Sequence, residues 1–188
     1  MRVIAGKYRS RRLQSLPGME LRPTSDRLRE TLFDILTAGN PAALEGTVWI
    51  DLYAGTGAVG IEALSRGAGM VYFVEAASDA AELIRKNLLT LGITSAFQVL
   101  RQDAIRALQA WGKSGIQTNF VFMDPPYVME AAYAQALTTL ASSAFLLPET
   151  IVMVEHQKKV DPGEQVASLQ RYRLLKQGDA ALSFYRRG

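Results

Sequence analysis

The chain has 188 residues, of which 48% are hydrophobic and 21% charged, and its formal net charge is +3. This length and apolar content suit one folded domain, so we expect residues 1–188 to form a single domain. The chain has no cysteine and a single histidine, His156. These counts exclude disulfide frameworks, thiolate metal sites and cysteine nucleophiles, and they favour chemistry supplied by a bound organic cofactor, without a metal.

Neither end of the chain indicates a membrane protein. A run of about 18 apolar residues, enough to span a bilayer, is absent. The first seven residues lack the apolar core of a signal peptide. We expect a cytoplasmic protein that is monomeric and does not bind membranes.

The positive charge is concentrated near the N-terminus. Residues 1–30 contain eight Arg or Lys and three Asp or Glu, a charge of +5, which leaves −2 for the rest. A basic segment on a near-neutral body is typical of a phosphate-binding surface, and the alternative is a solvated terminus without a partner.

In chain order, the first 40 residues predict an arm and a helix. Residues 2–13 alternate loosely between apolar and charged types, and the Pro and Gly positions at 17–18 and 22–23 predict turns, so we expect an extended arm or hairpin. Thr24 or Ser25 can cap the following helix, which the Gly-Asn-Pro sequence at 39–41 ends. Its apolar stripe is formed by Leu28, Leu32, Ile35 and Leu36.

Strand-like and helix-like segments alternate from residue 48 onward. The strands are predicted at residues 48–53, 70–74, 97–100, 120–123, 151–154, 172–176 and 181–185. The helices are predicted from about residue 59 and at residues 78–91, 104–111 and 131–141. This pattern predicts a doubly wound, mostly parallel α/β sheet of seven strands that ends in an antiparallel hairpin. The order resembles the Rossmann-like sheet of the Class I methyltransferases.

Residues 51–60, DLYAGTGAVG, join a strand to a helix through a glycine turn. Gly55 and Gly57 permit a sharp turn and the close approach of a ligand, and the N-terminus of the following helix attracts an anionic group. The GxGxxG spacing also fits dinucleotide-binding enzymes. Asp51 favours another ligand, because a carboxylate at the strand tip can meet a cationic amino group. The pattern DxxxGxG resembles motif I of the Class I methyltransferases, which bind S-adenosylmethionine.

Two further acidic residues follow the next two strands. Glu75 closes the second strand, where a carboxylate can accept hydrogen bonds from both ribose hydroxyls of a nucleoside. Asp103 resembles the position that contacts the adenine amino group in the methyltransferase family, although a helix N-cap is an equally good interpretation. The predicted cofactor-binding residues are Asp51, Tyr53, Ala54, Gly55, Thr56, Gly57, Glu75, Asp103 and Ala104.

The most specific motif is the apolar strand 119–123 followed by Asp124, Pro125, Pro126 and Tyr127. The two prolines fix the backbone and leave the carbonyls at the turn free to accept hydrogen bonds. An exocyclic base amine is a poor nucleophile, because its lone pair is delocalised into the ring. Asp124 and the Pro125 carbonyl can hold both of its N–H bonds while Tyr127 stacks on the base, so we predict residues 124–127 to be catalytic.

The tetrapeptide DPPY resembles motif IV of N-methyltransferases that act on adenine N6, guanine N2 or a glutamine amide. Together with residues 2–13 and 22–36 and the motifs above, it resembles the RsmD-like bacterial 16S rRNA guanine-N2 methyltransferase family over nearly the whole chain. The resemblance implies S-adenosylmethionine as cofactor and 16S rRNA, within a 30S subunit or a late assembly intermediate, as substrate. Residues 1–40 are then a basic arm and helix, and residues 41–188 the catalytic core. The predicted RNA-binding residues are Arg9, Arg11, Arg12, Arg22 and Arg27.

Three alternatives share parts of this pattern. A DNA adenine-N6 methyltransferase shares DPPY, but we expect it to need a larger target-recognition region than 188 residues hold. A nucleotide-binding oxidoreductase shares GTGAVG and has no use for DPPY, and an RNA-binding module without catalysis shares only the basic arm. The combination of motifs favours methyl transfer to an RNA amine.

Overall fold

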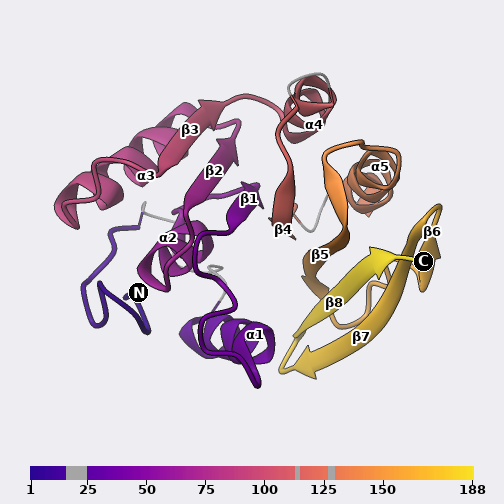
Figure 1. Ribbon diagram of the computed structural model, residues 1–188, viewed down its shortest axis with the longest axis horizontal. Coiled ribbons are helices and arrows are strands. Elements are labelled where there is room, and N and C mark those ends of the chain that lie inside the picture. Colours follow the sequence, from indigo (N-terminus) through magenta and orange to yellow (C-terminus); the bar gives the residue numbers. More distant parts are fainter. Residues whose placement is uncertain (16–24, 113–114, 127–129) are drawn as a thin grey trace.

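The computed structural model describes residues 1–15, 25–112, 115–126 and 130–188 (Figure 1). Its helices are α1 (Asp26–Thr37), α2 (Ala58–Ser65), α3 (Ser78–Thr90), α4 (Ala104–Trp111) and α5 (Glu130–Ala141). Its strands are β1 (Val48–Leu52), β2 (Met70–Glu75), β3 (Phe97–Arg101), β4 (Thr118–Met123), β5 (Leu146–Gln157), β6 (Gln165–Val166), β7 (Leu169–Gln177) and β8 (Ala180–Arg187).

One sheet contains all of these strands in the order β3-β2-β1-β4-β5-β8-β7-β6. Strands β1 to β5 run parallel to one another, β8 pairs with β5 in antiparallel orientation, and β7 and β6 continue the sheet in antiparallel pairs. The chain moves outward from β1 to β3 and then returns to place β4 on the other side of β1. The carboxyl ends of β1 and β4 therefore form the topological switch point, where ligands bind in open α/β sheets.

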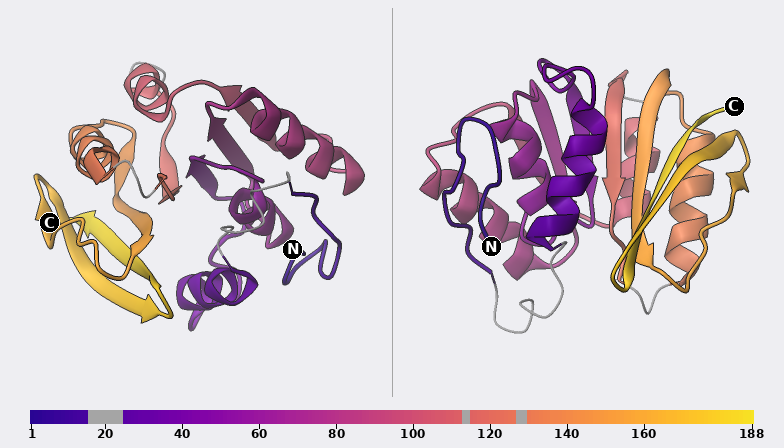
Figure 2. Two further views of the ribbon diagram at one scale, coloured as in Figure 1. Left: turned by 180° about the vertical axis from the view of Figure 1, so that it is seen from behind. Right: turned by 90° about the horizontal axis from the view of Figure 1, so that it is seen from below.

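Helices cover both faces of the sheet (Figures 1 and 2). Residues from α1, α2 and α3 pack on one face, around Trp49, and residues from α4 and α5 pack on the other. The Trp49 ring lies between those of Phe33 and Phe120, with centroid separations of 5.4 and 5.2 Å. Because side chains alternate along a strand, Trp49 and Asp51 point to the α2 face, while Ile50 and Leu52 point to the other.

The first 13 residues form a small hairpin beside α2 and α3 (Figure 1). Arg2 pairs with Arg12 in an antiparallel bridge, and the Val3 N–H donates to the Arg11 carbonyl at 2.9 Å. Val3 and Leu13 are buried in the same hydrophobic cluster as the residues of α1, α2 and α3. The predicted arm is thus a hairpin that packs against the helices on one face of the sheet.

The predicted seven strands are all present, and the doubly wound, mostly parallel sheet with a terminal antiparallel hairpin is confirmed. The eighth strand, β6, is only two residues long, too short for an alternation pattern to reveal it. Strand β5 begins earlier than predicted because Leu146 pairs with Thr118 before a register shift. Of the two candidate caps for α1, Ser25 accepts from the Leu28 N–H at 3.1 Å. Within the described residues, no helix has the length and apolarity needed to cross a membrane.

Candidate functional site

Four of the predicted acidic residues come together at one edge of the sheet. In the sheet register, Leu52 at the end of β1 lies beside Val74 on one side and Met123 on the other, and Glu75 lies beside Arg101. Asp51, Glu75, Asp103 and Asp124 therefore lie at, or within two residues after, the carboxyl ends of the four adjacent strands β1, β2, β3 and β4. Residues far apart in sequence thus share the switch-point edge.

The glycine turn between β1 and α2 is a tight loop in left-handed backbone conformations. Gly55 and Gly57 have φ angles of 54° and 77°, and Tyr53 has a φ of 60°, which is uncommon for a residue with a side chain. The Ala54 N–H donates to the Val74 carbonyl at 3.0 Å, and the Gly57 N–H to the Ala54 carbonyl at 2.7 Å. These contacts hold the loop over the end of β2.

Two glycines also allow close packing behind the loop. A Cβ at Gly57 would lie 3.2 Å from the Ile84 side chain, and a Cβ at Gly60 would lie 2.3 Å from the Phe73 ring. The second distance is too short for any side chain, so Gly60 lets α2 pack directly on β2. The GxGxxG spacing is thus explained by left-handed backbone at the first two glycines and by close packing at the second and third.

Asp51 lies beneath the loop and supports α2. Its side chain is buried, and its Oδ2 atom accepts from the Gly60 N–H at 2.9 Å. Burial raises the pKa of this carboxyl to about 8, with the nearby Glu75 carboxylate adding to the rise and the Gly60 hydrogen bond opposing it. A carboxyl group here fixes the first turn of the helix. Direct contact with a ligand's amino group stays a prediction.

Glu75 closes the loop from β2. Its Oε2 atom accepts from the Gly55 N–H at 2.9 Å, and its Oε1 atom accepts from the Ala77 N–H at 2.8 Å. The side chain is only half-buried, while Ala77 is exposed. A carboxylate has about four acceptor positions, so both oxygens can also accept from ligand hydroxyls.

Asp103 is the N-cap of α4. Its Oδ1 atom accepts from the Arg106 N–H at 3.0 Å, and the side chain is exposed, whereas Ala104 is buried. Burial, together with the Asp103 carboxylate, raises the pKa of the Tyr53 phenol, which indicates that the two side chains are neighbours. The predicted cap is therefore formed, and it uses only one of the two carboxylate oxygens. Contact of Asp103 with adenine stays a prediction.

The motif after β4 begins in the core and emerges at the switch point. Asp124 is half-buried, Pro125 is buried and Pro126 is exposed. Tyr127 lies outside the described residues. The Pro125 carbonyl accepts a long hydrogen bond, 3.4 Å, from the hydroxyl of Tyr133, a buried residue of α5 that the motif alone does not predict. Since a carbonyl oxygen has two lone pairs, Pro125 keeps one for a second donor.

The predicted RNA-binding residues lie on the arm and on α1. Arg9, Arg11, Arg12 and Arg27 are exposed, and Arg22 lies outside the described residues. Not all of the positive charge of residues 1–30 lies on the surface, however, because Arg29 is fully buried. Burial lowers the pKa of its guanidinium, and the Asp26 and Glu62 carboxylates oppose that shift.

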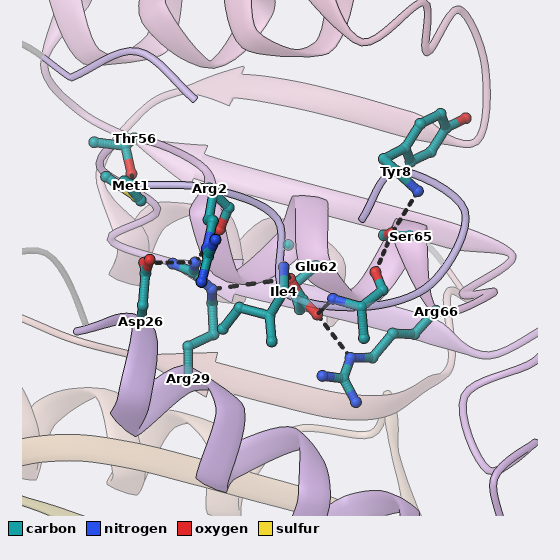
Figure 3. Close-up of polar contacts among 12 residues, drawn as sticks. Met1, Arg2, Ile4, Tyr8, Asp26, Arg29, Thr56, Glu62, Ser65 and Arg66 are labelled. Atoms are coloured by element: carbon teal, nitrogen blue, oxygen red, sulfur yellow. Dashed lines mark hydrogen bonds and ion pairs between the residues drawn. The ribbon is translucent and has the colours of Figure 1, made fainter. Parts of the chain in front are cut away.

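Glu62, which the sequence analysis missed, fastens the arm to α2 (Figure 3). Its carboxylate is fully buried and accepts from the N–H groups of Ile4 and Ala5 at 2.8 and 2.9 Å. Arg66 lies 2.8 Å from one oxygen, and Arg29 lies 4.0 Å from the other. A lone carboxylate within the apolar helix AVGIEALS was the available signal, since a buried charge requires partners.

Ser65 supplies a second attachment at the end of α2. Its hydroxyl accepts from the Tyr8 N–H at 3.0 Å and donates to the Ala5 carbonyl, and its own carbonyl accepts from the Lys7 N–H at 2.7 Å. The hairpin turns here through Gly6, whose φ is 78° and where a Cβ would lie 1.9 Å from the Ser65 carbonyl oxygen. Only glycine fits this contact.

His156, the single histidine, and the two arginines before the last residue contact other parts of the chain. His156 lies inside β5, with Nε2 2.9 Å from the Ser183 hydroxyl and Nδ1 2.9 Å from the Gln157 carbonyl. Burial lowers the pKa of His156, and the Gln157 carbonyl accepts from an N–H at Nδ1. Arg187 donates to backbone carbonyls of Ala141, Ser143 and Leu146, while Arg186 stacks over Tyr172.

Within the described residues, the structure contains no group of three or more His, Cys, Asp or Glu side chains that could hold a metal ion.

The chain is similar to known proteins along its whole length. The family model described as Conserved hypothetical protein 95 matches residues 1–186. The YlbH protein of Bacillus subtilis is 35% identical over 188 residues, covering 100% of this chain and 99% of that protein. The Ribosomal RNA small subunit methyltransferase D of Haemophilus influenzae is 33% identical, covering 99% of this chain and 92% of that protein.

A solved structure is also similar to this chain along its whole length. The yhhF protein of Escherichia coli is 30% identical to this chain and superposes with a TM-score of 0.84, covering 100% of this chain and 97% of that one. The predicted family and its Class I methyltransferase fold are thereby confirmed, and the similarity extends over the N-terminal hairpin. The chain belongs to the family of Conserved hypothetical protein 95, which includes the ribosomal RNA small subunit methyltransferases D.

Proposed function

We propose that this chain transfers a methyl group from S-adenosylmethionine to the exocyclic N2 of one guanine in small-subunit ribosomal RNA. The observation that carries the proposal is the position of Asp124 and the Pro125 carbonyl, which follow β4 directly beside the glycine loop after β1. An acceptor pair for an amine and a loop for a nucleoside cofactor thus share one edge.

The residues at the edge fit such a cofactor. Gly55 and Gly57 permit the tight turn of the loop, the N-terminus of α2 would attract the carboxylate of the cofactor, and Glu75 offers half-exposed acceptors for two hydroxyls. Asp103, exposed at the end of β3, would meet the adenine amino group. When bound, S-adenosylmethionine supplies a methyl group activated by a neighbouring sulfonium.

The chain's own contribution is to orient the amine. Asp124 and the Pro125 carbonyl accept hydrogen bonds from the two N–H groups of the guanine amine. These hydrogen bonds turn the nitrogen lone pair away from the ring and toward the methyl group. The nitrogen's proton becomes acidic only after the new N–C bond has formed, and it then passes to Asp124 or to solvent water. Asp124 therefore needs to accept a hydrogen bond and need not be a strong base, and Tyr127 stacks on the base.

The substrate is assigned from the arm and the relatives. Relatives from Haemophilus influenzae and Escherichia coli are named ribosomal RNA small subunit methyltransferase D. Exposed Arg9, Arg11 and Arg12 on one hairpin supply the phosphate contacts that such a substrate requires. We infer that the enzyme acts as a cytoplasmic monomer on the 30S subunit or a late assembly intermediate.

We also infer that residues 1–188 act as one domain. Val3 and Leu13 of the arm join the same hydrophobic cluster as Trp49 and Phe73 of the sheet, and Glu62 joins the arm to α2 by two hydrogen bonds. The arm thus has no core of its own.

The proposed function is tested by tritiated methyl transfer from S-adenosylmethionine to three substrates: undermethylated 30S subunits, protein-free 16S rRNA and duplex DNA. We expect the 30S subunits to accept about one methyl per particle and the DNA to accept none. Transfer to DNA alone would support the adenine-N6 alternative. The absence of transfer to every substrate, with RNA binding intact, would support a non-catalytic RNA-binding module.

A further inference from the structure

Asn87, a residue of α3, contacts two parts of the chain that are distant in sequence. Its side chain is 1% exposed. Its Oδ1 atom accepts from the Gln14 N–H at 2.8 Å, and its Nδ2 atom donates to the Gln14 carbonyl at 3.1 Å. The same Nδ2 atom donates to the Thr56 carbonyl at 3.0 Å. Asn87 therefore holds the chain where it leaves the hairpin and, at the same time, the middle of the glycine loop.

The chemistry of this contact is specific to a carboxamide. Toward Gln14, the Asn87 side chain acts as a strand neighbour would, by accepting from the backbone N–H and donating to the carbonyl of one residue. Its second amide hydrogen is left for Thr56. Aspartate can accept from Gln14 but cannot donate, so it would lose both donated bonds. A buried polar contact of this kind persists only when all its partners are satisfied.

A second contact joins the same two segments. The Thr56 hydroxyl lies 3.6 Å from the Met1 sulfur, and Figure 3 shows Met1 beside Thr56 at the start of the hairpin. Met1 thus contacts Thr56 directly, and Gln14, where the chain leaves the hairpin, is linked to Thr56 through Asn87. The middle of the hairpin differs, because Ser65 and Glu62 attach it to the body of α2, away from the loop.

We propose that Asn87 is a positioning residue for both ligands of the reaction: it fixes the RNA-binding arm and the cofactor loop to each other. The inference rests on the proposed function of those two segments. Asn87 touches neither ligand in this account. It acts through Gln14 on the arm and through Thr56 on the loop.

The test compares Asn87→Asp and Asn87→Ala with Ser65→Ala. Ser65→Ala is the matched control, because it also removes two side-chain hydrogen bonds to the arm backbone but none to the glycine loop. The affinities for S-adenosylhomocysteine and for 16S rRNA are measured by calorimetry and filter binding, at a temperature where each variant is folded. We expect both Asn87 variants to weaken both affinities about three- to tenfold, and Ser65→Ala to weaken only RNA binding.

A purely structural Asn87 would lower the unfolding temperature and leave both affinities unchanged, which would overturn the proposal. Weaker RNA binding alone would equally overturn it, since Asn87 would then act as Ser65 does. If neither variant folds, amide hydrogen exchange of the unmutated protein decides. Saturating S-adenosylhomocysteine should slow exchange of the Gln14 amide and leave that of Tyr8 unchanged, and equal behaviour of the two amides would overturn the proposal.

Failure of the proposed function has a different signature. In that case the unmutated protein would bind no S-adenosylhomocysteine or transfer no methyl group to RNA. The affinities of the Asn87 and Ser65 variants are compared only with an unmutated protein that binds S-adenosylhomocysteine and methylates RNA. Failure of the proposed function is therefore distinguishable from failure of the proposal for Asn87.

Discussion

Two regions of the molecule each contain a glutamate that accepts hydrogen bonds from two backbone N–H groups. One region is the contact between the arm and α2, and the other is the carboxyl edge of the sheet. Glu62, in the arm contact, is fully buried beside Arg66 and Arg29. Glu75, at the edge, is half-buried and accepts from the amides of Gly55 and Ala77. The two side chains have the same hydrogen-bonding chemistry and opposite access to solvent.

This difference separates a structural carboxylate from one available to a ligand. Glu62 cannot exchange partners without leaving a charge uncompensated in the core, which is strongly unfavourable. Glu75 holds amides of an exposed turn, so ligand hydroxyls can be added at its remaining acceptor positions. The arm contact therefore holds the chain together, and the edge is left for binding and chemistry. The following changes test that separation, from the largest expected effect to the smallest.

Glu62→Ala should destabilise the folded protein by about 3–5 kcal/mol, because it leaves buried Arg29 without one carboxylate and two arm amides without acceptors. Urea denaturation monitored by the fluorescence of Trp49 and Trp111 measures the free energy of unfolding. Glu75→Ala is the control and should change that energy by less than about 1 kcal/mol. Equal losses in the two variants would contradict the distinction drawn between the glutamates.

Asp124→Ala should lower single-turnover methyl transfer at saturating cofactor by about 10²–10³-fold, the effect of removing one positioned transition-state hydrogen bond. The affinity for S-adenosylmethionine should not change. Asp124→Asn keeps an acceptor without the charge and should fall between the wild type and the Ala variant. A wild-type rate for Asp124→Ala would mean that the residues after β4 form only a turn.

Replacing Arg9, Arg11 and Arg12 together by Gln should reduce the slope of log affinity for RNA against log salt by about 2, since each lost phosphate contact removes about 0.7. At 0.1 M salt this corresponds to a loss of about 10² in affinity. Filter binding across a salt series gives the slope. An unchanged slope would identify the hairpin as a solvated terminus.

Glu75→Ala should raise the dissociation constant for S-adenosylmethionine at least about tenfold, because two hydroxyl hydrogen bonds to a carboxylate are lost. These bonds exist in both the ground and the transition state, so the transfer rate at saturating cofactor should change little. Isothermal titration calorimetry measures the constant. An unchanged value would remove Glu75 from the cofactor site.

Asp51 predicts a pH dependence of stability, because its pKa is raised from its ordinary value to about 8 in the folded chain. Between these two pKa values the folded state holds a proton that the unfolded state has lost, so stability falls as the pH rises toward 8 and levels off above it. The slope is at most about 1.4 kcal/mol per pH unit. Asp51→Asn keeps the acceptor for Gly60 and should lack this slope in urea denaturation from pH 5 to pH 9, whereas parallel curves would contradict the assignment.

The sequence predicted those parts of the fold that depend on local patterns. The parallel strands, the terminal hairpin and the glycine loop each have a periodicity or turn signal within about ten residues. The convergence of Asp51, Glu75 and Asp124 followed from one topological rule, that parallel strands end on the same edge. The two-residue strand β6 had no such signal.

The contacts that hold the arm could not be predicted in the same way. Glu62 and Asn87 bind backbone groups 57 to 73 residues away, and a backbone acceptor or donor leaves no mark in the sequence. The burial of Arg29 could not be predicted from the sequence either. Its charge was counted as part of a basic surface, although the side chain is buried. Side-chain identity predicts the type of partner, whereas the location of that partner requires the fold.

Identification of the methylated nucleoside tests the central claim most directly. Undermethylated 30S subunits are incubated with the enzyme and methyl-labelled S-adenosylmethionine, and the 16S rRNA is then digested to nucleosides and analysed by mass spectrometry. The account predicts that the label appears as N2-methylguanosine and that its initial rate of appearance falls by about 10²–10³-fold with Asp124→Ala. Label in N6-methyladenosine, or label that appears at the wild-type rate in the Asp124→Ala reaction, would contradict it.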